Sequence, residues 1–184
     1  GARNKGAEIY RNTTVIGIKQ NKDGWVVETD KGSIECEHVI SCSGNFARQT
    51  GKMVGLEIPV IPVEHQYIVT EPHPEIQKRK KDGLPEMGVL RDSDTQWYMR
   101  EEAGGLLLGP YEKGAPCCYV DGPSKDSEYE LFQEDLERLA PHIEGAIHRV
   151  PAFGEVGVKK VYNGAICYTP DGNPIVGPAW GLKN

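Results

Sequence analysis

The pattern of strand-forming residues changes near residues 55–59, and this change limits the chain to folds that hold two different sheets. Before it, short strand signals alternate with turn residues, which predicts a three-stranded meander. The predicted strands are Thr13–Gln20, Trp25–Thr29 and Ser33–Cys36. The nearly continuous apolar run His38–Gly44 is typical of a strand buried on both faces, as in a parallel sheet. Phe46–Gly55 has helical spacing and ends at a glycine, so we expect a helix there.

A second, antiparallel sheet is expected after the change. Ile58–Thr70 is one long extended segment, and its prolines are typical of the start of an edge strand. Further along it, alternate residues share one face, namely Val63, His65, Tyr67 and Val69. Two short strands joined by glycines predict a hairpin, and one more strand is expected near the end of the chain. These strands are Thr95–Glu101, Leu106–Gly109 and Lys159–Tyr168.

A pair of helices is expected between the hairpin and the last strand. Ser127 and Glu130 have capping-box spacing, which predicts a helix start at Ser127. Pro141 suits the first turn of a second helix that runs to Val150. The sequence therefore predicts an α+β (α/β) fold in two parts, residues 1–56 with the meander and buried strand, and residues 57–184 with the antiparallel sheet and helix pair.

Charge and hydropathy argue against two classes of partner. The 184 residues carry a formal net charge of −6, whereas a surface that binds nucleic-acid phosphates needs a clustered excess of Lys and Arg. The one basic run, Lys78–Lys81, is predicted to be a solvated loop. No apolar stretch approaches the roughly 20 residues that cross a bilayer. We therefore expect neither a nucleic-acid nor a membrane partner.

The cysteines and the first residues predict the redox compartment of the chain and whether it is part of a longer protein. Its five cysteines lack paired spacing, and Cys117 and Cys118 are adjacent, so we expect neither a disulfide framework nor a metal site. The cysteines favour a reducing compartment, and we expect the cytoplasm of a bacterium or the mitochondrial matrix of a eukaryote and not secretion. Because the chain opens on Gly1-Ala2-Arg3-Asn4 without an initiator methionine, we expect an internal piece of a longer protein.

Five segments, taken in order, carry a resemblance to a known family. They are Glu64–Thr70, Val89–Asp92, Trp97–Glu101, Leu106–Glu112 and the glycine- and proline-punctuated Tyr168–Pro178. Together they resemble the dimethylglycine dehydrogenase, sarcosine dehydrogenase and dimethylglycine oxidase branch of the D-amino-acid-oxidase-like flavoproteins. The resemblance implies that residues 1–56 are part of a glutathione-reductase-like FAD-binding domain. Residues 57–184 are then an antiparallel substrate domain, incomplete at its C-terminal end.

The resemblance also implies site residues. His65 would manage the substrate proton and Tyr98 would position the amine, as the two catalytic residues. Tyr67, Arg91 and Arg100 are candidates for substrate binding, the arginines because a guanidinium binds a carboxylate. Backbone groups at six positions would contact FAD: Thr14, Val15, Ser43, Gly44, Pro174 and Gly177. The alternatives are a histidine satisfied within a sheet, aromatic residues that pack on their neighbours, and surface salt bridges.

The activity that the resemblance implies is oxidative demethylation of dimethylglycine or a similar N-methyl amino acid. Hydride would pass to flavin N5, and the iminium would be hydrolysed or captured by tetrahydrofolate, with an electron acceptor for the reduced flavin. The family's Gly-x-Gly-x-x-Gly turn for the FAD pyrophosphate does not occur in these residues. We therefore expect the piece alone to be inactive, to bind FAD weakly or not at all, and to self-associate. The alternatives are a deaminating amino-acid oxidase and a non-catalytic β-rich binding or assembly module.

Overall fold

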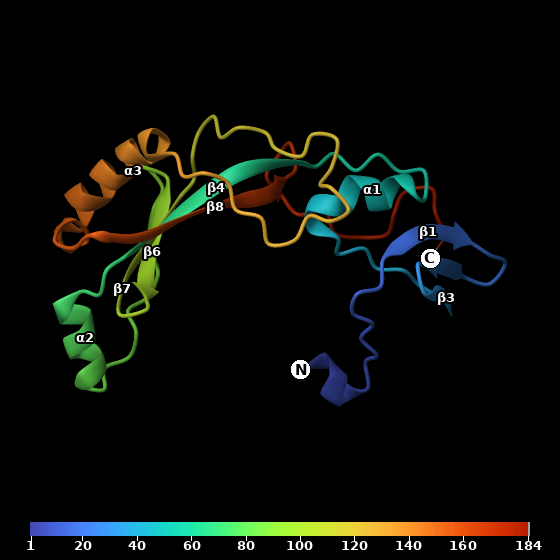
Figure 1. The fold of residues 1–184 in the computed structure, drawn as a ribbon, viewed down its shortest axis with the longest axis horizontal. Helices are drawn as coiled ribbons and strands as arrows, with labels where there is room; N and C mark the ends of the chain where they lie inside the picture. The colour runs from blue at the N-terminus through green and yellow to red at the C-terminus, as the bar shows by residue number, and fades with distance from the viewer. Residues whose placement is uncertain (184) are drawn as a thin grey trace. The chain divides into compact units, whose positions relative to one another are not determined.

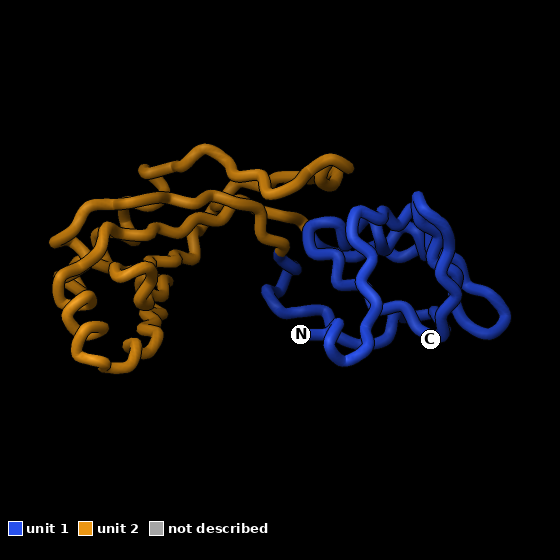
Figure 2. Tube along the Cα trace, turned by 60° about the horizontal axis from the view of Figure 1, so that its bottom comes forward, with its two compact units in different colours: residues 1–60, 168–184 blue, residues 61–167 orange. Residues whose placement is uncertain are grey.

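The computed structural model describes residues 1–183, which form two compact units (Figures 1 and 2). Unit 1 contains Gly1–Val60 and the segment that begins at Tyr168, and unit 2 contains Ile61–Cys167. The division after Val60 lies close to the expected change near residues 55–59. The segment from Tyr168 groups with unit 1, whereas the sequence placed it in the second domain. The last strand ends at Tyr168 and turn residues follow, so the chain leaves the sheet of unit 2 there.

The meander of unit 1 is confirmed as an antiparallel sheet in the order β1-β2-β3. Its strands are β1 (Val15–Gln20), β2 (Trp25–Thr29) and β3 (Gly32–Cys36), preceded by the 3-10 turn η1 (Ala2–Lys5). The Asn21 side chain closes the first hairpin, because its oxygen accepts hydrogen bonds from the backbone N–H groups of Asp23 and Gly24. A Cβ at Gly24 would overlap the Cys36 carbonyl, so this turn requires glycine.

The buried strand predicted at His38–Gly44 is wrong. Residues 38–43 are irregular, and the side chain of Ile40 is 85% exposed. A doubly buried strand needs neighbours that satisfy its backbone groups and cover both faces, and neither sheet in residues 1–183 includes this run. The predicted helix that follows is confirmed in shorter form, as the 3-10 turn η2 (Gly44–Phe46) and helix α1 (Ala47–Lys52).

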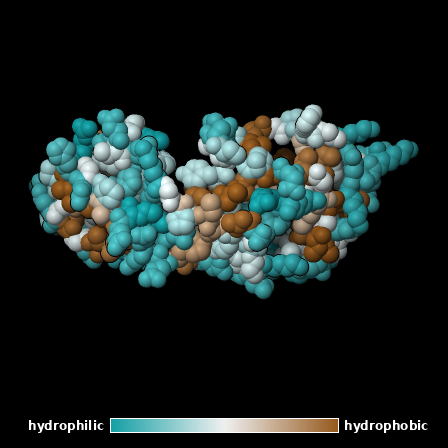
Figure 3. Space-filling view, turned by 90° about the horizontal axis from the view of Figure 1, so that it is seen from above, coloured by the Kyte–Doolittle hydropathy of each residue, from teal (hydrophilic) through white to brown (hydrophobic). Residues whose placement is uncertain are grey.

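Apolar side chains remain on the surface of unit 1. Val176 and Trp180 are 88% and 96% exposed, respectively, and Figure 3 shows apolar patches among hydrophilic residues on the face that it draws. Residues 169–173 form a tight turn, in which the Asp171 carboxylate accepts a hydrogen bond from the Asn173 N–H. That bond lowers the pKa of Asp171 below its ordinary value. Asp171 is therefore a turn residue, as its Pro-Asp-Gly context predicts.

Unit 2 is built on the expected antiparallel sheet, whose strand order is β5-β6-β7-β4-β8. The long strand and the hairpin of the sequence are confirmed, and the short edge strand β5 was not predicted. The five strands are β4 (Ile61–Thr70), β5 (Leu90–Asp92), β6 (Trp97–Glu102), β7 (Gly105–Pro110) and β8 (Val158–Tyr168). Figure 1 shows β4 and β8 side by side although about ninety residues separate them in sequence.

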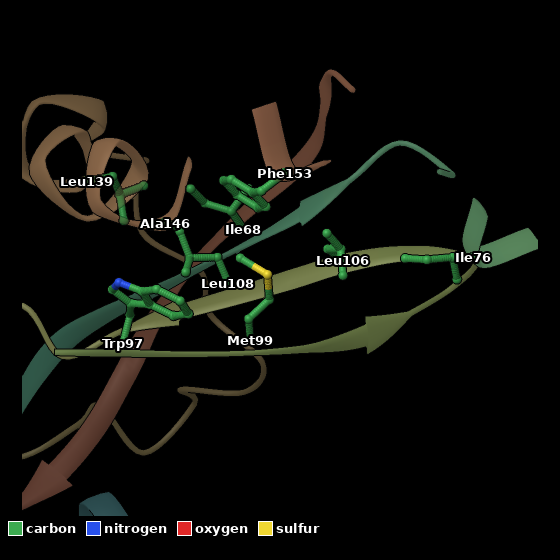
Figure 4. Close-up of a cluster of buried hydrophobic side chains, with 9 residues drawn as sticks. All are labelled: Ile68, Ile76, Trp97, Met99, Leu106, Leu108, Leu139, Ala146 and Phe153. Atoms are coloured by element: carbon green, nitrogen blue, oxygen red, sulfur yellow. The ribbon is translucent and has the colours of Figure 1, made fainter. Parts of the chain in front are cut away.

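One face of this sheet is covered by helices and holds the core of unit 2. Figure 4 shows Leu139 and Ala146 of α3 (Leu136–Arg149) pointing at the strands, and Ile76 of α2 (Pro74–Lys81) near Leu106. The other buried residues of this core are Ile68, Trp97, Met99, Leu108 and Phe153. Phe153 belongs to the 3-10 turn η3 (Pro151–Gly154). At roughly 25 cal/mol per Å² of apolar surface, burial of each large side chain stabilises the fold by about 1.5–3 kcal/mol.

The predicted helix pair is a single helix, α3, which begins at Leu136. The Ser127 hydroxyl donates a hydrogen bond to the Glu130 carboxylate at 2.8 Å. The two residues of the predicted capping box therefore bond to each other and do not cap a helix. Phe132 donates its N–H to the Asn163 carbonyl, which keeps this segment extended along β8. Pro141 lies inside α3 on its exposed side, where water can reach the carbonyl that the proline leaves unpaired.

The basic run Lys78–Lys81 is also corrected, because it forms the last turn of α2 instead of a loop. His73 starts the helix by accepting a hydrogen bond at Nδ1 from the Glu75 N–H, and Pro74 occupies the first helical position. The lysines then lie at the C-terminal end, where positive charge favours the helix dipole. None of the helices in residues 1–183 is long and apolar enough to cross a bilayer.

Candidate active site

The second face of the five-stranded sheet carries a cavity of about 490 Å³. Strand alternation directs every second side chain of β4 and β6 to this face, away from the helix-covered core. Three sequence candidates meet in its lining, namely Tyr67, Tyr98 and Arg100. The other residues around the cavity are Val69, Glu102, Ala103, Leu107, Lys159, Lys160 and Tyr162.

Tyr111, which the sequence did not single out, links three other candidates. Its ring centroid lies 6.1 Å from that of His65 and 6.0 Å from that of Tyr98, with tilted planes. The Arg91 guanidinium lies over the same ring, 5.0 Å from its centroid, which is cation–π geometry. The structure thus joins His65, Tyr98 and Arg91 through one aromatic side chain. Tyr111 lies within the segment Leu106–Glu112 that carries the family resemblance, which was the available signal.

Gly109 determines where the Tyr98 ring lies. The two residues are register partners on β7 and β6. A Cβ built on Gly109 would overlap ring carbons of Tyr98 and its hydroxyl oxygen, so the ring crosses bare backbone at this point. Gly109 has an ordinary backbone conformation, so glycine is needed here for space and not for a positive φ.

A second aromatic pair borders the cavity. The rings of Tyr67 and Tyr162 stack with centroids 4.7 Å apart and an interplanar angle of 17°. The Lys160 ammonium lies 4.5 Å from the centroid of Tyr162. Partial burial and the neighbouring Tyr162 raise the pKa of Tyr67, so its phenol stays protonated at neutral pH. Tyr162 and Lys160 were missed because their strand was predicted without any chemical motif on it.

The two arginines predicted to bind a carboxylate have different surroundings. Arg100 forms an ion pair with Glu102, with Nη1 and Oε2 2.6 Å apart, at the edge of the cavity. Arg91 contacts the Tyr111 ring instead. Arg100 therefore forms the salt bridge that was its alternative interpretation, and Arg91 is the arginine linked to His65 and Tyr98.

His65 is half-buried on β4, and its ring pKa is lowered from the ordinary value of 6.5. Burial is the main cause, because it disfavours the charged imidazolium. The Glu112 carboxylate opposes the shift and the Arg138 guanidinium adds to it. A neutral imidazole is therefore present near pH 7, which is the form that can accept a proton.

Glu112 and Arg138 belong to a buried network on the other side of β4. The Glu112 side chain is fully buried; it pairs with Arg138 Nε and accepts hydrogen bonds from the N–H and side-chain amide of Gln66. Glu64 accepts from Arg138 at 3.3 Å and from the Asn163 side chain at 2.9 Å. Asp135 also lies 3.6 Å from Arg138, so one cation is shared by three carboxylates, and the network joins β4, β8 and α3.

Comparison with protein families identifies the chain. The model of the FAD dependent oxidoreductase (DAO) family matches residues 1–184. The chain belongs to this family. The mitochondrial dimethylglycine dehydrogenases of Mus musculus and Homo sapiens are each 40% identical to it over the whole chain. The mitochondrial sarcosine dehydrogenase of Mus musculus is 33% identical over 97% of the chain. The chain spans only about a fifth of these relatives, between 19% and 22% of their lengths.

Solved structures confirm the fold of this oxidoreductase family. L-proline dehydrogenase from P. horikoshii superposes with a TM-score of 0.72 and 23% identity, covering 97% of this chain and 44% of that one. Glycine oxidase from Geobacillus kaustophilus gives a TM-score of 0.66 and 24% identity, covering 98% and 43% of the two chains. The α+β fold class is therefore correct.

The six positions predicted to contact FAD all lie in unit 1, in three separate segments. Gly44 and Gly177 adopt positive φ angles of 54° and 141°, and a Cβ at either would meet no neighbouring atom. Thr14, Val15 and Pro174 are exposed, and Ser43 is half-buried. Accessible backbone of this kind fits a flat, phosphate-bearing cofactor that is held through main-chain groups.

Proposed function

We propose that the protein containing this chain is an FAD-dependent oxidoreductase that oxidatively demethylates dimethylglycine or a similar N-methyl amino acid. Family membership supports the use of FAD, and the 40% identity with dimethylglycine dehydrogenases over the whole chain supports this donor class. The observation that carries the site assignment is the tyrosine-lined cavity beside the His65–Tyr111–Tyr98 cluster.

In this proposal unit 1 contributes to FAD binding and unit 2 holds the substrate. The backbone at Thr14, Val15, Ser43, Gly44, Pro174 and Gly177 would contact the cofactor. When bound, FAD supplies the oxidant that takes a hydride from the N-methyl carbon. The proposal has four further parts. They are tetrahydrofolate as a second cofactor, a separate electron acceptor, self-association, and a mitochondrial matrix location in a eukaryote. The last rests on the mitochondrial relatives.

His65 accepts the proton of the substrate amine. An amine must be unprotonated before its carbon can lose a hydride, so a neutral base near pH 7 assists the reaction. Burial keeps the pKa of His65 below 6.5, which supplies that base. Contacts of both rings with Tyr111 support a joint role of His65 and Tyr98 on one ligand, although His65 itself lies outside the cavity lining.

Tyr98 positions the amine, and Tyr67 closes the cavity beside it. Tyr98 lies over Gly109 and lines the cavity, and in this proposal its hydroxyl would hydrogen-bond a substrate nitrogen or carboxylate. Tyr67 is held by its stack on Tyr162. Arg91 and Arg100 remain candidates for the carboxylate, although Arg100 is already paired with Glu102 and Arg91 lies over the Tyr111 ring outside the cavity lining.

The test uses single-turnover reduction of the flavin by dimethylglycine in the full-length, FAD-loaded protein. We expect His65→Ala and Tyr98→Phe each to slow reduction by at least tenfold, which is about 1.4 kcal/mol of barrier. His148→Ala and Tyr129→Phe are matched controls at exposed positions and should leave the rate unchanged. If both site variants stay within about threefold of the unmodified protein, the assignment is wrong. Release of ammonia in place of formaldehyde would overturn the demethylation reaction.

A further inference from the structure

The cavity contains more positive than negative charge. Three basic residues border it, Arg100, Lys159 and Lys160, against the single acidic residue Glu102. That carboxylate lies 2.6 Å from Arg100, so one anion and one cation neutralise each other. Among the ion pairs of residues 1–183, neither lysine takes part. The excess positive charge of the cavity therefore comes from β8.

Strand alternation distinguishes the two lysines. Val161 of β8 packs against the core cluster, and Asn163 hydrogen-bonds to Glu64 and to the Gln133 carbonyl, so odd-numbered side chains point to the helix-covered side. Even-numbered side chains then face the cavity. Lys159 also borders the cavity, but the alternation directs its side chain away from it, whereas Lys160 points toward it.

Contacts of Lys160 agree with this direction. Its ammonium lies over the ring of Tyr162, 4.5 Å from the centroid, and Tyr162 stacks on Tyr67 in the cavity lining. A cation–π contact of this kind favours one region of space for a flexible side chain. The ammonium has three hydrogen-bond donors, and a ring face engages at most part of them, so donors remain for a ligand.

We propose that Lys160 binds the carboxylate of the substrate, an inference that rests on the proposed function. At Arg100 an amino-acid carboxylate would have to share the guanidinium with Glu102, whereas Lys160 takes part in none of the ion pairs of residues 1–183. Tyr67 and Tyr98 line the same cavity, so one small molecule can contact Lys160 and the aromatic residues together. Lys160 thereby selects N-methyl amines that carry a carboxylate over those that do not.

Isovalerate is a suitable probe, because it has the shape and carboxylate of dimethylglycine with a carbon in place of the nitrogen. Its binding to the full-length, FAD-loaded protein can be measured by titration calorimetry, without any reaction. We expect Lys160→Met to weaken isovalerate binding at least tenfold and Lys160→Arg to retain most of it. Lys159→Met is the matched control, with the same charge change one residue away, and should change the affinity less than threefold.

Flavin reduction provides the second measurement. We expect Lys160→Met to raise the half-saturating concentration of dimethylglycine at least tenfold, with little change in the limiting rate. Reduction by 2-dimethylaminoethanol, which lacks the carboxylate, should not depend on Lys160. Equal isovalerate affinities in the Lys160→Met and Lys159→Met proteins would overturn the inference. If isovalerate binding depends on Lys160 but dimethylglycine does not reduce the flavin, the carboxylate site stands and the proposed function fails.

Discussion

The two faces of the five-stranded sheet differ completely although they share one backbone. On β6 and β7, Trp97, Met99 and Leu108 point into the helix-covered core, while Tyr98 and Arg100 line the open cavity. The covered face therefore determines stability, and the open face is free to carry polar and aromatic groups that would be costly in a core. Substitutions of adjacent side chains on one strand should then act mainly on unfolding at the covered face and mainly on substrate binding or reaction at the open face.

The buried network of Glu64, Glu112 and Arg138 is the exception on the covered side. Charges there are held by each other and by the amides of Gln66 and Asn163. The same charges act on His65, which faces the other way. The two faces are thus electrostatically coupled at β4, and three variants test how far their separation holds.

Replacement of Arg138 should have the largest effect. Arg138→Met leaves the fully buried Glu112 and the partly buried Glu64 without their cation, and loss of one partner of a buried pair costs about 3–5 kcal/mol. Arg149→Met on the same helix is the control, because Arg149 is 59% exposed and its partner Asp92 still accepts hydrogen bonds from the N–H groups of Asp94 and Thr95 when the arginine is removed, so the loss should be smaller. Urea unfolding measures the loss of unfolding free energy in both variants. Equal losses would show that the covered face tolerates buried carboxylates.

Gly109→Ala should have an intermediate effect. The added methyl group overlaps the Tyr98 ring and must displace it, at about 1–3 kcal/mol for an overpacked site. Flavin reduction should slow as well, because the ring leaves its position over β7. In a Tyr98→Ala background the same methyl group has room, so its cost should largely disappear.

Gly88→Ala is the control for the double-mutant cycle of Gly109 and Tyr98. A Cβ at Gly88 meets open space, and the backbone φ there is not positive. Urea midpoints of the single and double variants give the coupling energy between Gly109 and Tyr98. If Gly109→Ala costs the same with and without the Tyr98 ring, the methyl group clashes with something else.

The pH dependence of His65 should give the smallest effect. Its pKa is lower in the folded protein than the 6.5 of a free histidine, so the unfolded chain binds a proton more readily. The resulting stabilisation is fully present above pH 6.5 and is lost as the pH falls from there through the folded pKa. We expect the acidic limb of the flavin-reduction rate to lie below pH 6.5 and to vanish in His65→Gln. A limb at or above pH 6.5 would contradict the neutral-base role.

Features with a local signal were predictable from the sequence. Asn21–Gly24 closes its hairpin through the Asn21 side chain, and the alternation of β4 and β6 follows from their residues alone. His38–Gly44 was mispredicted because an apolar run indicates burial but does not supply the strands that would cover it. Tyr111 and Lys160 lack any motif of their own, so only the pairing of distant strands makes them part of the site.

The start of α3 depends on a side chain far away in the sequence. The Gln66 amide donates to the Asp135 carbonyl and accepts from the Asp135 N–H, which reproduces the double hydrogen bond of a strand pair. Asp135 in turn caps α3 through the Arg138 N–H. The boundary of the helix is therefore fixed only after a loop of 69 residues has closed. A mutation at Gln66 should therefore weaken the start of α3 from outside the helix.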